Sequence, residues 1–99
     1  MAEYRIEVTE NAKDDLSIYT AFERKTITFA IREQLMQQPS VETRKRKKLR
    51  DHPVAAWELR AERYQIFYEV DEPTRNVTII AVGHKEHNTL YIRGKEVQL

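Results

Sequence analysis

Cysteine is absent from this chain of 99 residues, glycine occurs twice and proline three times. The lack of cysteine excludes disulfide bonds and thiolate-bound metal ions. The scarcity of glycine and proline argues against long flexible linkers, and the sequence shows no internal repeat. No apolar run approaches the length of a membrane span, and no signal peptide is recognisable at the N-terminus. We therefore expect a single domain over residues 1–99, located in the cytoplasm and without a membrane partner.

Charged residues are plentiful and unevenly placed. They make up 33% of the chain, against 40% for apolar residues, which is polar for a globular domain but above the disordered range. The formal net charge is only +1. Acidic residues gather between positions 3 and 15, whereas six of the seven residues from 44 to 50 are basic. This asymmetry indicates one surface for an anionic partner rather than a protein that is basic throughout.

The segment from Ser40 to about Asp51 is predicted to be a loop, and it contains the basic run Arg44–Arg50. Two interpretations of this run are open. A run of like charges is most often a solvated loop. Alternatively, a cationic loop that leads into two adjacent strands can hold a polyanion against a face of the sheet.

The first part of the chain predicts a strand followed by two helices. Residues Tyr4–Val8 alternate with a period of two, as in a strand. Asn11 is the expected N-cap of a short first helix, in which Ala12, Leu16 and Tyr19 share one face. The capping-box spacing of Thr20 and Glu23 predicts the start of a second helix. The apolar residues of the second helix form one stripe, and it should end near positions 37–38. The stripe is Ile27, Ala30, Ile31 and Leu35.

The second part predicts three strands in a meander. Val54–Ala61 and Tyr64–Val70 are expected to pair through a tight turn. Val77–Val82 is rich in β-branched residues and is expected to be a central strand that Gly83 ends. Thr89–Ile92 fits either a short strand or a helical turn. The order predicts an α+β domain, with a helix hairpin on one face of a mainly antiparallel sheet and the other face open to solvent or a partner.

The two-residue alternation of each strand in this meander predicts which face of the sheet its aromatic residues occupy. Trp57 alternates in phase with Leu59, so we expect it in the core. Tyr64 and Tyr68 alternate in phase with apolar neighbours and are also expected in the core. Phe67 faces the other way, where it could stack on a base or support a partner helix.

Four motifs of the second part form a recognisable set. They are Trp57-Glu58-Leu59-Arg60, Tyr64-Gln65-Ile66-Phe67-Tyr68-Glu69-Val70-Asp71, Ala81-Val82-Gly83-His84-Lys85 and Leu90-Tyr91-Ile92. With the order of elements, they resemble the RelE/ParE superfamily, small toxins of bacterial and archaeal type II toxin–antitoxin systems. The resemblance implies a RelE-like fold of order β-α-α-β-β-β and a cytoplasmic toxin that a cognate antitoxin holds inactive. It is also compatible with a homodimer or a toxin–antitoxin hetero-oligomer.

The resemblance implies activity on one of two targets. The RelE branch cleaves mRNA in the ribosomal A site without a metal or other cofactor, and the ParE branch poisons DNA gyrase. In the first reaction a base activates the 2′-hydroxyl of RNA, cations stabilise the phosphorane and an acid protonates the leaving oxygen. We expect a ribosome-dependent mRNA endoribonuclease. The alternatives are a ParE-like gyrase inhibitor and a catalytically weak homologue that serves as an antitoxin-binding module.

The resemblance also assigns roles to individual residues. Arg60 and Lys85 take the positions of catalytic cations, and Tyr91 that of a residue that stacks on a base or helps proton transfer. Gln65 stands where an arginine is usual, and Glu58 where a lysine can stand. The change at position 65 removes a phosphate-binding cation. The implied RNA-binding residues are Lys45, Arg46, Lys47, Lys48, Arg50 and Gln65.

Histidines supply the remaining candidates. His84 and His87 lie beside Lys85, and with Glu58 they could form an alternative acid–base group, since imidazole titrates near neutral pH. An ordinary exposed loop is the other interpretation of this segment. A two-histidine metal site has no third ligand at a suitable spacing. His52 is expected in a structural or solvent-exposed turn.

Overall fold

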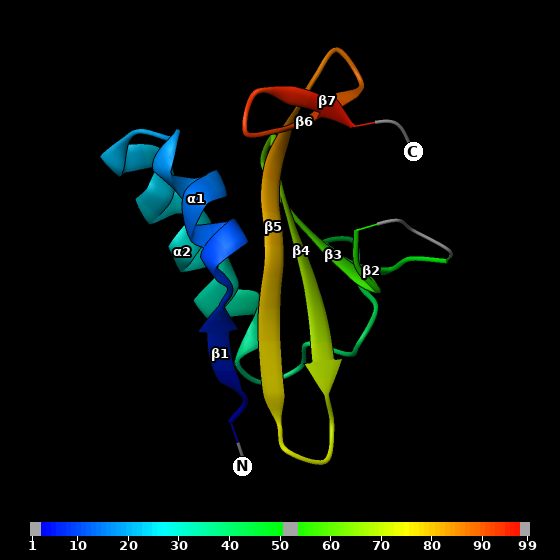
Figure 1. Cartoon of the computed structure of the whole chain (residues 1–99). Helices are drawn as coiled ribbons and strands as arrows, with labels where there is room; N and C mark the ends of the chain where they lie inside the picture. Colours follow the sequence, from blue (N-terminus) through cyan, green and yellow to red (C-terminus); the bar gives the residue numbers. More distant parts are fainter. Residues whose placement is uncertain (1–2, 51–53, 98–99) are drawn as a thin grey trace.

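A computed structural model describes residues 3–50 and 54–97 of the chain, and Figure 1 shows its arrangement. Both helices lie on one side of a sheet, as predicted for an α+β fold. The elements in order are β1 (Arg5–Val8), α1 (Glu10–Ser17), α2 (Ala21–Leu35), β2 (Arg46–Lys48), β3 (Trp57–Ala61), β4 (Tyr64–Asp71), β5 (Asn76–Glu86), β6 (Thr89–Ile92) and β7 (Lys95–Val97).

The sheet is organised around β5. Its strands run in the order β2-β3-β4-β5-β6-β7 with antiparallel neighbours, and β1 is parallel to β5. The prediction that β5 is central is therefore confirmed. Strand β1 pairs with the first part of β5 and β6 with its last residues. The structure also settles Thr89–Ile92 as a strand.

Gly83 does not end the central strand, contrary to the sequence prediction. Strand β5 continues through it to Glu86. A Cβ atom at Gly83 would lie 2.5 Å from the backbone oxygen of Tyr91 and 2.8 Å from the Ile92 side chain. Glycine is therefore needed here because β6 approaches the strand closely, and not because the chain turns.

Helix α1 packs along β5 between the residues of β5 that pair with β1 and those that pair with β6. The N-cap is Thr9 rather than the predicted Asn11, and its side chain accepts a hydrogen bond from the Ala12 amide at 3.1 Å. From the same helix, the buried carboxylate of Asp15 accepts a hydrogen bond from the Val82 amide at 3.0 Å. Asp15 also pairs with Arg93, with 2.7 Å between Oδ1 and Nε. Burial raises the pKa of Asp15 above its usual value.

Helix α2 begins with the predicted capping box, in which Thr20 and Glu23 satisfy each other's backbone amides. It ends at Leu35 with Met36 as the C-cap, slightly earlier than expected. The predicted stripe faces the sheet, with Ile27, Ile31 and Leu35 buried. Within the described residues, 3–50 and 54–97, no helix is both long and apolar enough to cross a membrane.

The core has a larger part beneath the helices and a smaller part on the opposite face of the sheet. Trp57, Tyr64 and Tyr68 belong to the larger part, as predicted. Phe67 lies in the smaller part and is 1% exposed, so it is not open for stacking on a base as expected. Leu90 of β6 packs there too, so the face predicted to be open is partly covered.

The basic segment forms an edge strand, although a loop was predicted. In β2, Arg46 is the Cα partner of Leu59, and Lys48 that of Trp57. The preceding chain shields the free edge, because the Thr43 amide donates to the Arg46 oxygen at 2.9 Å. Such shielding is a common protection of edge strands against unwanted pairing.

Candidate functional site

Four predicted site residues meet on the face of the sheet opposite the helices. Arg60 and Gln65 are Cα partners across β3 and β4, and Gln65 is paired with Gly83 of β5. The Glu58 carboxylate is buried, accepts a hydrogen bond from Nε2 of Gln65 and lies 3.5 Å from Nε of Arg60. The Arg60 side chain is half-exposed. Lys85 completes the group from β5.

A small hollow with a volume of about 140 Å³ lies at this place. Its described lining contains three cationic side chains and one carboxylate. The lining residues are Arg60, Glu62, Arg63, Tyr64, Gln65 and Lys85. Three cations, Arg60 of β3, Arg63 of the β3–β4 turn and Lys85 of β5, make the hollow complementary to an anion the size of a phosphate group.

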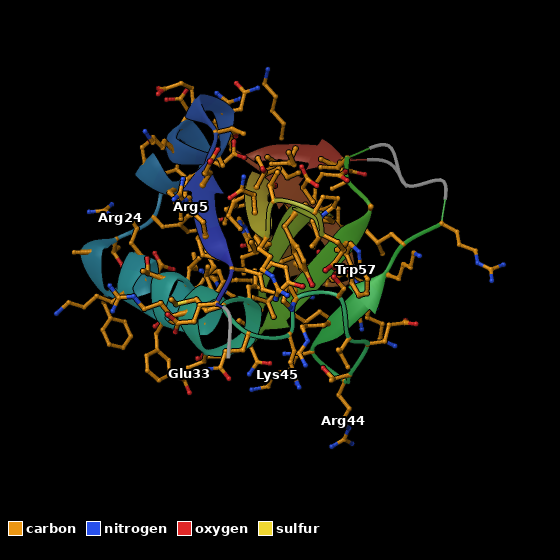
Figure 2. The ribbon with its side chains drawn as sticks, turned by 90° about the horizontal axis from the view of Figure 1, so that it is seen from below. Arg5, Arg24, Glu33, Arg44, Lys45 and Trp57 are labelled. Carbon is orange, nitrogen blue, oxygen red and sulfur yellow. The ribbon has the colours of Figure 1, made fainter. Side chains whose placement is uncertain are left out.

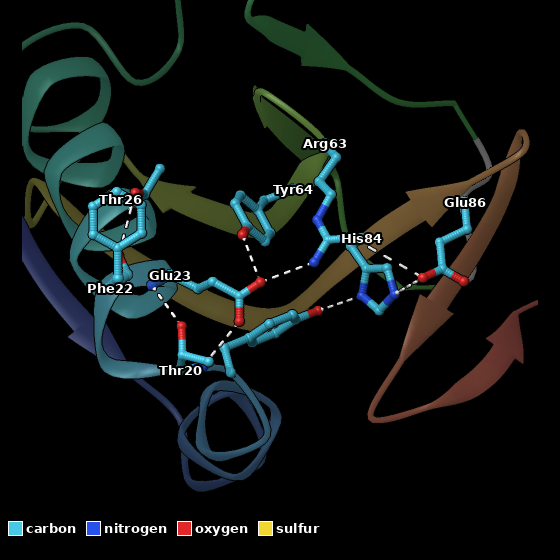
Figure 3. Close-up of polar contacts among 9 residues, drawn as sticks. Thr20, Phe22, Glu23, Thr26, Arg63, Tyr64, His84 and Glu86 are labelled. Atoms are coloured by element: carbon cyan, nitrogen blue, oxygen red, sulfur yellow. Dashed lines mark hydrogen bonds and ion pairs between the residues drawn. The ribbon is translucent and has the colours of Figure 1, made fainter.

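A second polar group lies on the helix side of the sheet (Figure 3). The Tyr19 hydroxyl is 2.7 Å from Nδ1 of His84, and Nε2 of His84 is 3.6 Å from a Glu86 carboxylate oxygen. Burial raises the pKa of Tyr19 to about 12, so its hydroxyl stays protonated, and it can donate to Nδ1 or accept from it according to the His84 tautomer. The His84 ring stacks on Tyr91, with 5.8 Å between centroids.

Arg63 connects the hollow with this second group. Its guanidinium lies 2.8 Å from Oε2 of Glu23 and 4.0 Å from Glu86. The Tyr64 hydroxyl donates to the same Glu23 oxygen at 2.9 Å. The hydrogen bond from the Thr20 amide, followed by those from Tyr64 and Arg63, lowers the pKa of Glu23 to about 2. Glu23 therefore stays ionised near neutral pH and links α2 to the β3–β4 turn.

Comparison with known proteins identifies the family. The sequence matches the model of a family described as the ParE toxin of the type II toxin-antitoxin system parDE, over residues 6–89. The chain belongs to the ParE toxin family, within the RelE/ParE superfamily. The toxin has no match among the curated proteins.

A solved structure supports the fold of the toxin. The toxin is similar to a chain in the crystal structure of the toxin–antitoxin complex RelBE2 from Mycobacterium tuberculosis, with a TM-score of 0.72 and 23% identity. The likeness covers 84% of the toxin and 99% of that chain. At this identity the likeness concerns the fold alone, and it agrees with the predicted RelE-like architecture.

The predicted catalytic residues of the toxin fall into two groups on opposite faces of the sheet. Lys85 lines the hollow with Arg60, while its neighbour His84 contacts Tyr19 beneath the helices. Successive residues of a strand alternate between faces, which separates His84 from Lys85. Tyr91 is the Cα partner of His84 and lies on the same face of the sheet as His84. His87 is exposed in the β5–β6 turn, with a φ of 50°.

The predicted RNA-binding residues differ in exposure. Arg46 is 6% exposed, and its guanidinium donates to the backbone oxygens of Val41 at 2.8 Å and Gln34 at 2.9 Å. Arg46 therefore ties β2 to the end of α2 and does not present its charge to a ligand. The exposed members of the set are Lys45, Lys47, Lys48 and Arg50. His52 lies outside the described residues.

Lys45 lies at the mouth of a larger groove between α2 and the end of β3. This groove has a volume of about 500 Å³, and Lys45, Arg60 and Glu33 are among its lining residues. Figure 2 shows Lys45 near Glu33 of α2, whereas Arg44 points away from the protein. Arg60 lines both the groove and the hollow, so the two adjoin at this residue.

Sequence reasoning missed the residues that join the two groups. Arg63 fell in the tight turn predicted between two strands, and Glu23 was explained fully by its capping role. Tyr19 was placed on an apolar helix face. The period-two alternation of β5 could have separated His84 from Lys85, but the assumption that Gly83 ended the strand concealed it.

Proposed function

We propose that the toxin is a metal-independent endoribonuclease that cleaves mRNA on the ribosome and thereby inhibits translation in the cytoplasm. The observation that carries this proposal is the cation-lined hollow containing Arg60 and Lys85. Preorganised cations around a phosphate stabilise the charge that develops when it is attacked. RNA supplies its own nucleophile, the 2′-hydroxyl, so the protein needs only to orient and polarise it.

Proton transfers are assigned to the remaining predicted groups. Glu58 is the proposed base, because its carboxylate lies beside Arg60 and is oriented by Gln65. His84 and Tyr91 are on the other face of β5 from the hollow, so we assign base stacking to them. Lys85, which lines the hollow, is the proposed donor of the proton to the leaving oxygen. Arg63 links this part of the sheet to the hollow, because it lines the hollow and its guanidinium lies near Glu86.

The exposed basic residues provide the proposed contact with the RNA backbone. Lys45, Lys47, Lys48 and Arg50 are free of the internal role that Arg46 performs. They lie on and beside the edge strand β2, and Lys45 among them lines the groove beside α2 together with Arg60. We assign ribosomal RNA or mRNA phosphates to this surface, and we leave Arg46 out of it.

A cognate antitoxin is the proposed protein partner, as membership of a type II toxin family indicates. Two large apolar side chains of α2 are strongly exposed, Phe22 at 77% and Phe29 at 66%. Exposed aromatic residues of this size mark an interaction surface. Purified toxin should therefore be more soluble when it is co-expressed with its antitoxin.

The test is a reconstituted translation reaction. Purified toxin should cut ribosome-bound mRNA, leave 2′,3′-cyclic phosphate ends and remain active in EDTA. Free mRNA at the same concentration should be cut much less. Intact mRNA after incubation with folded toxin would remove the proposal.

Inhibition of DNA gyrase is the second candidate, and the family match to a ParE toxin over residues 6–89 favours it. The separation of His84 and Tyr91 from the hollow is also compatible with a toxin that cuts no nucleic acid. A supercoiling assay with purified gyrase distinguishes this candidate. A toxin inactive in both assays would be an antitoxin-binding module.

A further inference from the structure

Arg63 is a cation of the hollow that no sequence motif singled out. It occupies the two-residue turn between β3 and β4, after Glu62, which has a φ of 55°. The backbone oxygen of Arg63 accepts a hydrogen bond from the Lys85 amide at 2.9 Å. The turn is thereby fixed beside β5, and Arg63 and Lys85 are lining residues of the hollow together with Arg60.

Position 65 does not supply a cation to this hollow. Gln65 is neutral and 5% exposed, and its amide nitrogen donates to Glu58. A buried amide held in this way cannot offset the charge of a phosphate. Of the described residues that line the hollow, Arg60, Arg63 and Lys85 are the cations that a phosphate would meet.

The partners of the Arg63 side chain hold it in place and leave some of its N–H donors free. A Glu23 carboxylate oxygen lies 2.8 Å from Nη2 of Arg63, and a Glu86 carboxylate oxygen lies 4.0 Å from Nη1. The guanidinium carbon lies 5.4 Å from the centre of the Tyr64 ring. The side chain remains 49% exposed. A guanidinium has five N–H donors in a planar fork, so two carboxylate contacts leave donors for an oxyanion.

We propose that Arg63 binds the phosphate of the RNA substrate together with Arg60 and Lys85, and that it supplies the cation that position 65 lacks. This inference rests on the proposed ribonuclease function. Glu23 and Glu86 are positioning residues that keep the fork at the rim of the hollow. A mainly structural role, in which Arg63 braces α2 against the sheet through Glu23, is the outcome that the experiments below must separate.

The first experiment uses inorganic phosphate as a probe and does not depend on catalysis. In an NMR titration, the arginine Nε–H signals of Arg60 and Arg63 should shift together and saturate with the same apparent affinity. The signal of Arg32, an exposed arginine on the outer side of α2, should not saturate with them. A saturable shift at Arg60 without one at Arg63, or no saturable shift at either, would overturn the inference.

The second experiment measures single-turnover cleavage of ribosome-bound mRNA at saturating toxin. Arg63→Gln should lower the rate about 10²–10³-fold, as removal of a preorganised charge stabiliser typically does. Arg63→Lys should recover part of the rate, and the control Arg32→Gln should leave it unchanged. Glu23→Gln breaks the ion pair but keeps the cation, so its loss should stay below about 10-fold.

Thermal unfolding of the same variants identifies a purely structural role. If Arg63 only braces α2, Arg63→Gln and Glu23→Gln should lower Tm and the cleavage rate to the same extent, and the inference would be wrong. Failure of the proposed function looks different. In that case the wild type cuts no mRNA, while the phosphate titration still reports whether Arg63 and Arg60 bind one anion.

Discussion

The Tyr19 hydroxyl lies 2.7 Å from Nδ1 of His84, and this contact joins the connection between α1 and α2 to the central strand β5. The two rings also meet edge to face, with centroids 5.7 Å apart. This contact fixes the imidazole between Tyr19, Glu86 and Tyr91. His84 is therefore a residue with a defined orientation rather than part of a solvated loop.

Replacement of Tyr19 by phenylalanine removes this hydrogen bond and keeps the ring packing. The free energy of unfolding should fall by about 1 kcal/mol, the usual net value of one buried hydrogen bond. The nitrogen chemical shifts of the His84 ring should also change, because Nδ1 loses its hydrogen-bond partner. Tyr4→Phe is the control, because its hydroxyl bonds Glu72 at the exposed surface. Unchanged His84 shifts in Tyr19→Phe would contradict the assigned contact.

The ion pair and hydrogen bonds of Glu23 predict a specific pH dependence of stability. Its folded-state pKa of about 2 is below the ordinary 4.5. The unfolded chain therefore binds more protons between these values, so the contribution of Glu23 is complete above pH 4.5 and is lost as the pH falls toward 2. Glu23→Gln should lower Tm at pH 7, and the difference from wild type should shrink between pH 5 and pH 3. A difference that stays constant over this range would contradict the assignment.

Gly83→Ala tests the close approach of β6 to β5. The new Cβ would meet the backbone oxygen of Tyr91, so the strand itself must move. Unfolding free energy should fall by about 3 kcal/mol, the upper end of typical overpacking costs. Gly94→Ala is the matched control, since a Cβ there meets nothing within 4 Å and only the φ of 74° is unfavourable. Chemical denaturation should show the larger loss at Gly83, and equal losses would argue against the packing explanation.

The exposed lysines of β2 are predicted to contact RNA phosphates. Each such contact adds about 0.7 to the slope of log affinity against log salt for a single strand. The double change of Lys47 and Lys48 to alanine should therefore reduce the slope for ribosome or RNA binding by about 1.4. Lys13→Ala, a change in α1, is the control. If the slope does not fall, the basic segment is a solvated edge strand that does not contact RNA.

Local signals in the sequence predicted the elements that depend on local contacts. The capping box of Thr20 and Glu23 starts α2 because both partners lie within one turn. The alternation in Tyr64–Val70 correctly placed Tyr64 and Tyr68 in the core. These features follow from the period of the backbone and need no knowledge of distant residues.

Other features depend on partners far along the chain, and the sequence could not reveal them. Arg46 is buried because Gln34 and Val41 offer it carbonyl oxygens, and a charge run gives no sign of this. Strand β7 exists because Leu90 and Ile92 of β6 pair with it. The role inferred for Arg63 requires both Glu23 of α2 and Lys85 of β5. Each of these contacts joins segments whose proximity only the fold establishes.

The most direct test of the account compares single-turnover cleavage of ribosome-bound mRNA by wild type, Arg60→Ala, Lys85→Ala and Gln65→Arg. Loss of either cation should lower the rate about 10²–10³-fold, because each stabilises the charged transition state. Gln65→Arg should raise the rate, since it adds a cation to the same hollow. The account predicts active wild type, two impaired variants and one improved variant, all unaffected by EDTA. Wild type that cuts no ribosome-bound mRNA, together with a Gln65→Arg variant that is equally inactive, would contradict it.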